Sequence, residues 1–260
     1  MTTPSADAVI REIAALGPFF AVRVHPAGTE PPRPWQPLTR PLLEARVTGV
    51  RNRLAAQGSQ RADAVETRVA ASVAHLALAS RLMSPALAAA VLHGSLLAPT
   101  LAELRGQSVP EGPLPLSVPD DALTACPDAL PAQLADALSR RLLDGAVCEL
   151  ADAMAAFAVS RHILWGNTAS ALNGAATMVT AFRPDLAART RTLVALLLDR
   201  PPLRGTGTVA DGAFRRRSCC LVYRAAPDGR GALCGDCALS RALRRVGAPR
   251  PVTRVRPDAT

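Results

Sequence analysis

Residues 41–83 read PLLEARVTGVRNRLAAQGSQRADAVETRVAASVAHLALASRLM, and the spacing of their apolar side chains decides the fold class. From 41–57 the apolar residues recur at the intervals of one helix face. A Gly-Ser pair interrupts this pattern, and a second, longer helix is expected from there to Met83. Ser84 and Pro85 have the residue types of an N-cap and a first-turn proline, which predicts a further helix from that point. Successive helices of this kind stack as a bundle.

The flanking regions contain further helical patterns and one candidate strand. Residues 6–16 have helical spacing and are stopped by Pro18. Residues 19–25 alternate weakly between apolar and polar side chains, so they are the best strand candidate in the chain. In the second half, helices are expected over residues 132–143, 146–163 and 184–198. The predicted fold class is mainly α: a helical bundle-like domain with a short N-terminal strand or hairpin and a C-terminal segment that carries four cysteines.

Composition agrees with this class and narrows the function. Hydrophobic residues make up 49% of the 260-residue chain and aromatic residues only 3%, so the core must consist of small and medium aliphatic side chains. The net charge of +9 comes from 30 basic residues, all of them Arg and dispersed along the chain. Without clustering or aromatic interleaving they do not predict nucleic-acid binding. No secretory leader and no long apolar run is recognised, which predicts a cytoplasmic protein with at most weak peripheral contact with the inner face of the membrane.

Changes in composition suggest five regions along the chain. Four prolines and two glycines between residues 106 and 119 predict a linker between two helical halves. After residue 200 glycines, arginines and cysteines replace the helical pattern. The expected regions are an N-terminal helical half (1–105), a proline-rich linker (106–119), a C-terminal helical half (120–212), a cysteine segment (213–241) and a basic tail (242–260).

Four of the six cysteines fall within nineteen residues. Cys219 and Cys220 are adjacent, thirteen residues follow, and Cys234 and Cys237 form a C-x-x-C pair. Four thiolates that converge on one point repel each other and need a cation to hold them. In a reducing cytoplasm the pattern therefore predicts a metal centre rather than disulfides.

The spacing leaves the kind of centre open. Structural zinc sites usually separate the cysteines of both pairs by about two to four residues, and only the second pair here does so. Adjacent cysteines are easier to place on a cluster, which offers two irons and a longer reach. A [2Fe–2S] cluster and a zinc ion remain alternatives, with disulfides or unliganded thiols as a third. Cys126 and Cys148 lie in helical patterns and are expected to be buried side chains rather than ligands.

Arginines surround the cysteines, at positions Arg215, Arg216, Arg217, Arg224 and Arg230. Cations beside a [2Fe–2S] cluster favour its more negative, reduced state and would raise its reduction potential. Two other interpretations are a solvated surface loop and a docking face for an acidic electron-donor protein. Arg217 and Arg224 are the candidates for contacting the cluster ligands from outside.

Two motifs resemble the FhuF-like ferric-siderophore reductases. RSCCLVYR at 217–224, followed by LCGDC at 233–237, is similar to the C-terminal iron–sulfur segment of that family. SRHILWGNTASAL at 160–172 looks like the L-W-G-N segment of the same family. The resemblance covers roughly residues 160–241 and is limited elsewhere to helical character and the segment 18–20.

The resemblance implies a function that composition does not. It implies that Cys219, Cys220, Cys234 and Cys237 hold a [2Fe–2S] cluster, which reduces Fe(III) in imported siderophores of the hydroxamate type. No Gly-rich phosphate-binding motif follows a strand, so electrons are expected from an external donor such as a ferredoxin or a flavin reductase. The other hypotheses are a zinc-stabilised helical interaction module without redox activity and an accessory protein of siderophore biosynthesis.

Two features of the motifs need a structural account. The thirteen residues between the cysteine pairs exceed the interval of about ten in the family, and the excess lies among residues 226–228 and Arg230. The longer loop costs about a few tenths of a kcal/mol in closure free energy. Trp165 and Asn167, with the glycine between them, interrupt a helical pattern. Trp165 could pack over the cluster and Asn167 could donate a hydrogen bond to a sulfur or to a cysteine backbone; the alternative is a tight helix contact with Asn167 as a cap.

Overall fold

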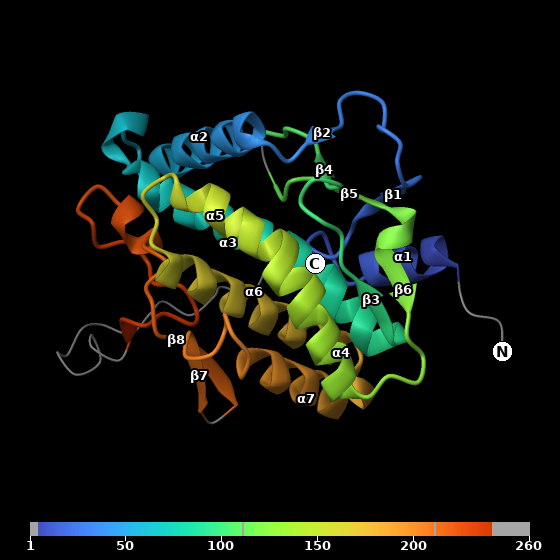
Figure 1. Cartoon of the computed structure of the whole chain (residues 1–260). Coiled ribbons are helices and arrows are strands. Elements are labelled where there is room, and N and C mark those ends of the chain that lie inside the picture. The colour runs from blue at the N-terminus through green and yellow to red at the C-terminus, as the bar shows by residue number, and fades with distance from the viewer. Residues whose placement is uncertain (1–4, 111, 211, 241–260) are drawn as a thin grey trace, which may run out of the picture.

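The computed structural model describes residues 5–110, 112–210 and 212–240, and it is mainly helical, as the sequence predicts. Figure 1 shows α3 through the middle of the molecule, with α2 above it and α6 and α7 below it in that view. The α-helices are α1 (Ala6–Ala14), α2 (Arg40–Gln57), α3 (Thr67–His93), α4 (Pro131–Leu138), α5 (Cys148–Ala155), α6 (Arg161–Phe182) and α7 (Ala187–Leu198). Shorter helical elements are η1 (Ala62–Ala64), η2 (Asp120–Ala122), η3 (Ser139–Val147, π-helical), η4 (Pro184–Leu186) and η5 (Val222–Ala225).

Helix α3 forms the centre of the core, and it corrects one prediction. It packs along α6 and α2 and also contacts α1, α5 and α7, so most of its residues are buried. The helix expected to begin at Ser84 and Pro85 does not exist as a separate element, because both residues lie inside α3 and are buried there. A proline inside a helix costs about 3 kcal/mol through the lost hydrogen bond and ring clash. Burial of this part of α3 on all sides offsets that cost. The local pattern of Ser84 and Pro85 carries no information about this burial, so it could not predict a continuous helix.

The second half differs from its predicted helices in two ways: the helix expected over residues 146–163 is broken, and residues 164–182, where no helix was expected, are helical. The helix expected over residues 146–163 ends with α5 at Ala155, and α6 begins at Arg161. Ser160 caps the new helix by accepting a hydrogen bond from the Ile163 N–H at 3.4 Å, and Ala158 turns the chain with φ 58°. The L-W-G-N segment therefore does not interrupt a helix; it lies inside α6.

The strands form small sheets beside the helices. They are β1 (Arg23–His25), β2 (Gln36–Pro37), β3 (Ser95–Leu97), β4 (Arg105–Gly106), β5 (Leu116–Pro119), β6 (Leu123–Ala125), β7 (Gly207–Ala210) and β8 (Ala213–Arg216). One sheet has the order β1-β5-β4-β2 with β1 and β5 parallel, and the other two are the pairs β3-β6 and β7-β8. The N-terminal strand is thus present within the expected segment 19–25. Residues 106–119, expected as a linker, include β5, whose residues are all buried, so this segment is a packed part of the fold.

A buried arginine joins the N-terminal loop and the sheet to α3. The Arg81 guanidinium donates hydrogen bonds to the carbonyl oxygens of Pro18, Ala21 and Leu114 at 2.5–2.8 Å. Burial lowers the pKa of Arg81 to about 10. These three carbonyl oxygens lie outside helices and strands, and the guanidinium of Arg81 supplies a hydrogen-bond donor to each of them.

Two remaining expectations concern the membrane and the chain end. By length and composition, α3 is the one helix among the described residues that could cross a membrane, but 78% of its apolar window is buried inside the protein. The basic tail expected at 242–260 lies outside the described residues, as does residue 241 of the cysteine segment.

Candidate metal centre

The β7-β8 hairpin leads directly into the cysteine segment. After β8 the chain reaches Cys219 and Cys220, and the Sγ atoms of Cys220 and Cys234 lie 3.5 Å apart. Cys237 is close enough to influence the ionisation of both Cys219 and Cys234. Cys220 and Cys237 are each 2% exposed, and the other two are half-buried. The structure therefore places Cys220 and Cys234 in contact, with Cys219 and Cys237 nearby in the same segment.

The remaining cysteines lie elsewhere in the fold. Cys126 follows β6 and is half-buried, and Cys148 is the first residue of α5. All six cysteines are free thiols. Neither Cys126 nor Cys148 joins the C-terminal group.

Backbone N–H groups point at two of the sulfurs. The Leu221 N–H donates to Cys219 Sγ and the Leu239 N–H donates to Cys237 Sγ, both at 3.3 Å. Leu221 has φ 68°, a left-handed conformation that turns the chain immediately after the Cys-Cys pair. Hydrogen bonds of this kind stabilise a thiolate and are one of the determinants of potential in iron–sulfur proteins.

The cysteine thiols also shift one another's pKa. The hydrogen bond from Cys234 to Cys220 lowers the pKa of Cys220 and, together with burial, raises the pKa of Cys234. Burial also raises the pKa of Cys219. Without a cation, only some of these four groups can ionise together, whereas a bound metal removes this conflict.

Four cysteine sulfurs are a donor set that fits either a two-iron centre or a single tetrahedral ion. Four sulfurs on one tetrahedral ion lie about 3.8 Å from one another, from a metal–sulfur bond of about 2.3 Å. Within the described ranges, no three His, Cys, Asp or Glu side chains converge closely enough to hold one ion. Cys220 and Cys234 form a single close pair. A tetrahedral ion and a [2Fe–2S] cluster, which takes two thiolates on each iron, both require further sulfurs beside this pair.

A chain of buried hydrogen bonds connects the L-W-G-N segment to the cysteines. Asn167 Nδ2 donates to the Ser72 carbonyl oxygen at 2.9 Å and to Ser72 Oγ at 3.2 Å. Ser72 Oγ donates in turn to the carbonyl oxygen of Cys220 at 2.8 Å. Arg216 donates to Asn167 Oδ1. Asn167 is thus neither a helix cap nor a direct partner of a cysteine, but it acts on the Cys220 backbone through Ser72.

Gly166 allows the cysteine segment to approach α6. A Cβ atom at this position would lie 2.0 Å from Ser218 Oγ and 3.4 Å from Ser218 Cβ. Ser218 directly precedes Cys219, and its buried hydroxyl has no hydrogen-bond partner among the described residues. The glycine of the motif is therefore required by close packing rather than by backbone flexibility.

The mutation Gly166→Ala is expected to destabilise the protein by about 1–3 kcal/mol, because the new methyl group overpacks the contact with Ser218. Ser218→Ala should rescue it, since only the ordinary 3.4 Å contact with Cβ remains. Chemical denaturation followed by circular dichroism measures both effects. Gly174→Ala is the matched control on α6: nothing lies within 4 Å of its Cβ, so it should stabilise by up to about 1 kcal/mol. An equal loss from Gly166→Ala with and without Ser218→Ala would contradict the contact.

Further contacts hold the cysteine segment on the helices. Ser170 Oγ of α6 donates to Asp236 Oδ2 at 2.5 Å, inside the C-x-x-C pair. Arg224 forms an ion pair with Glu66 at 2.6 Å, just before α3. Gln60 Nε2 donates to the Ala225 carbonyl oxygen at 2.5 Å. Both cysteine pairs are thereby fixed to the same helical surface.

The additional residues between the pairs form an exposed turn. Gly229 has φ 67°, and its N–H donates to the Ala226 carbonyl oxygen at 2.8 Å. The Gly231 N–H donates to the Tyr223 carbonyl oxygen at 2.8 Å and closes the base of the turn. The excess residues 226–228 and Arg230 therefore extend the loop without separating the cysteines.

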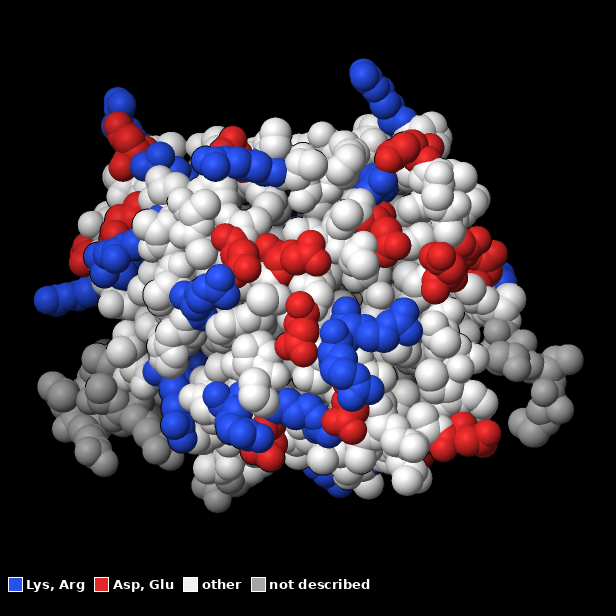
Figure 2. Space-filling model, in the orientation of Figure 1, with Lys and Arg blue, Asp and Glu red and all other residues white. Residues whose placement is uncertain are grey.

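The structure distinguishes the residues that surround the predicted ligands. Arg217 is exposed and Arg224 is paired with Glu66, so neither candidate is buried beside the sulfurs. Arg216 is 3% exposed and lowers the pKa of both Cys219 and Cys220 through its charge, against the effect of burial. Trp165 is buried in α6. On the face shown in Figure 2, arginines are interspersed with Asp and Glu rather than gathered in one basic surface.

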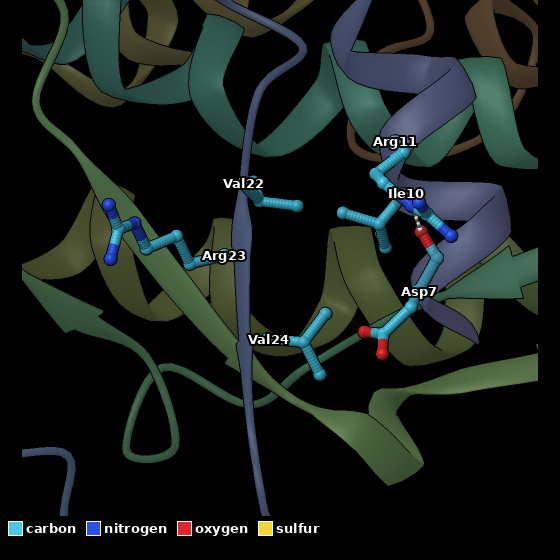
Figure 3. Close-up of a pocket in the computed structure, with 6 residues that line it drawn as sticks. All are labelled: Asp7, Ile10, Arg11, Val22, Arg23 and Val24. Carbon is cyan, nitrogen blue, oxygen red and sulfur yellow. Dashed lines mark hydrogen bonds between the residues drawn. The ribbon is translucent and has the colours of Figure 1, made fainter.

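An open cavity of about 520 Å³ lies at the other end of α3. Figure 3 shows it between α1 and β1, with Val22 and Val24 facing α1 and Arg23 on the opposite side of the strand. The C-terminal residue of α3, His93, contacts Glu12 of α1 at 3.4 Å, whereas Ser72 contacts the cysteine segment near the N-terminal end. The two regions are about 30 Å apart along the helix, so this cavity is separate from the cysteine site. Its lining residues are Asp7, Ile10, Arg11, Val22, Arg23 and Val24.

No protein-family model matches this sequence, and comparison with curated proteins finds none similar to it. Membership of the reductase family therefore stays a prediction carried by the two motifs, which the fold brings into contact.

Proposed function

We propose that the protein is a ferric-siderophore reductase that holds a [2Fe–2S] cluster on Cys219, Cys220, Cys234 and Cys237. The observation that carries the proposal is the joint packing of its two motifs. The L-W-G-N helix lies against the Cys-Cys pair through Gly166, and its asparagine supports the pair through Ser72. Asn167 and Ser72, which are 95 positions apart in the sequence, are thus joined beside the backbone of Cys220.

The chemistry suits a site without acid, base or nucleophile. When bound, the cluster supplies one electron at a time. Hard oxygen chelators such as hydroxamates hold Fe(III) much more tightly than Fe(II), so one electron weakens the complex and releases the metal. The chain's own contribution is to fix the four thiolates, to direct backbone N–H groups at Cys219 and Cys237, and to keep two ligands largely out of water.

The exposure of the site also bears on the proposed electron donor and on where in the cell the reaction takes place. Cys219 and Cys234 are half-buried, which brings the centre near enough to the surface for electrons to enter and leave. The sequence contains no nucleotide-binding motif, so the donor is a separate ferredoxin or flavin reductase. We place this exchange in the cytoplasm, where imported ferric siderophores would be reduced.

Purification without oxygen tests the cofactor. The expected result is a reddish-brown protein with iron and acid-labile sulfide in equal amounts and a rhombic electron paramagnetic resonance signal after reduction. Stoichiometric zinc without sulfide would favour the interaction module instead. A metal-free protein with a Cys220–Cys234 disulfide, detected by mass spectrometry, would contradict both.

Single-turnover oxidation tests the reaction. The reduced protein is mixed anaerobically with a ferric hydroxamate siderophore, and an Fe(II) chelator records the released metal. One Fe(II) is expected for each cluster that is reoxidised. A cluster that hydroxamate, catecholate and citrate complexes all fail to reoxidise would remain an electron carrier with another acceptor.

A further inference from the structure

Arg216 is the one arginine near the cysteines that is both buried and without a carboxylate partner in the described part of the chain. Its side chain is 3% exposed at the end of β8. Nη2 donates to Asn167 Oδ1, whereas Nε and Nη1 have no hydrogen-bond partner among the described residues. The nearby Asp236 contributes its carbonyl oxygen to the Arg216 N–H, and its carboxylate accepts from Ser170.

The other arginines around the cysteines differ in this respect. Arg217 and Arg230 are exposed, and Arg224 pairs with Glu66. Arg215 is half-buried and donates to Ser240 Oγ at 2.6 Å. Water or an opposite charge compensates an exposed or paired guanidinium, but a buried one costs several kcal/mol unless an anion is near.

Among the described residues, the cysteine sulfurs can supply this anion once they are ionised, because the nearby Asp236 carboxylate already accepts from Ser170. Arg216 lies three residues before Cys219, and its backbone N–H donates to the Asp236 carbonyl oxygen, between Cys234 and Cys237, at 3.0 Å. His75, fully buried on α3, adds no charge, because burial and Arg216 lower its pKa to about 3. A [2Fe–2S] centre with four thiolates is an anion that gains one further negative charge on reduction. A fixed buried cation therefore stabilises the reduced form more than the oxidised form.

We propose that Arg216 is the built-in counter-ion of the cysteine centre and holds its reduction potential high enough for an external donor to reduce it. This inference rests on the proposed function, since it requires a cluster on the four cysteines. The inference assigns this role to one of the five arginines around the cysteines, which the sequence alone could not distinguish from one another. Asn167 orients the guanidinium. Arg216 is not a ligand; it acts on the reduction potential of the cluster.

Spectroelectrochemical titration of the holoprotein tests this role. In R216Q the ratio of reduced to oxidised cluster at a fixed potential should fall at least tenfold, equivalent to a shift of about 59 mV for one electron. R216K keeps the charge and should restore most of the wild-type ratio. R217Q removes an exposed neighbouring charge and should change the ratio less than twofold, because water and salt screen it.

A second variant, N167D, tests the same role of Arg216 if R216Q does not fold. N167D keeps the side-chain shape, places a carboxylate against the guanidinium, and gives up the two hydrogen bonds from Nδ2 to Ser72. It should also lower the ratio of reduced to oxidised cluster at least tenfold. If either variant holds its full complement of iron and sulfide at the wild-type potential, Arg216 is not the counter-ion. A wild-type protein that holds zinc without sulfide overturns the proposed function itself, and this inference with it.

Discussion

Cys220→Ser should lose at least about nine-tenths of the iron and acid-labile sulfide that the wild-type protein holds after anaerobic purification. A serine hydroxyl stays protonated where the thiol would ionise, so the variant lacks one anionic ligand. Cys220 is 2% exposed, and its carbonyl oxygen is fixed by Ser72. Its place cannot be taken by a neighbouring side chain without breaking that contact. Metal analysis, the sulfide assay and the visible spectrum measure the loss.

The other cysteines provide the comparison. Cys219→Ser tests whether the adjacent residue is a separate ligand, and the expected loss is as large as for Cys220→Ser. Cys126→Ser and Cys148→Ser should keep the full spectrum, because both residues lie outside the C-terminal group. An unchanged spectrum in Cys219→Ser would show that the Cys-Cys pair contributes only one ligand. Loss of iron in Cys148→Ser would contradict the assignment of the ligands.

The helical part of the fold could be predicted where periodicity and end signals agree. The helix predicted over residues 41–57 is observed as α2, Arg40–Gln57. The prediction failed at Pro85, because Ser84 and Pro85 were taken as the start of a new helix without the burial that keeps α3 continuous. It failed again after Ala155, where neither proline nor glycine marks the end of α5.

The candidate ligands could be predicted from the sequence, but the residues that hold them in place could not. Cysteine spacing selected four candidate sulfurs, of which the fold places Cys220 and Cys234 in contact. Ser72 carries no motif; it is one polar residue in an apolar helix, and its partner Cys220 is 148 positions away. Arg216 looked equivalent to its neighbours until burial separated them. Such contacts depend on how α3, α6 and β8 pack, and no local pattern encodes that arrangement.

The two motifs therefore form a single structural unit. Gly166 removes a side chain so that Ser218 can approach α6, and Asn167 satisfies both Ser72 and Arg216 on its neighbouring surfaces. A helix supplies the rigid frame, and the cysteine segment, which has little regular structure, takes its shape from that frame. A substitution inside α6 should then affect the centre without touching a ligand.

Asn167→Leu is expected to lower the free energy of unfolding by about 3 kcal/mol or more. The change removes both donors to Ser72 and leaves Arg216 buried without its side-chain acceptor, and hydrogen bonds to charged groups contribute about 1.5–3 kcal/mol each. For a chain of this size, that loss corresponds to a fall in Tm of about 6–12 °C. Thermal denaturation of the anaerobically purified protein measures it.

Asn173→Leu makes the same substitution two turns further along α6, at a half-buried position whose side chain forms none of the hydrogen bonds found in the structure. Its unfolding free energy should change by less than about 0.5 kcal/mol. Asn167→Leu should also release iron to a chelator faster than Asn173→Leu, because Ser72 is no longer held in place to fix the Cys220 carbonyl oxygen. Equal Tm values and equal rates of iron release in the two variants would mean that the buried hydrogen-bond chain does not support the cysteine site.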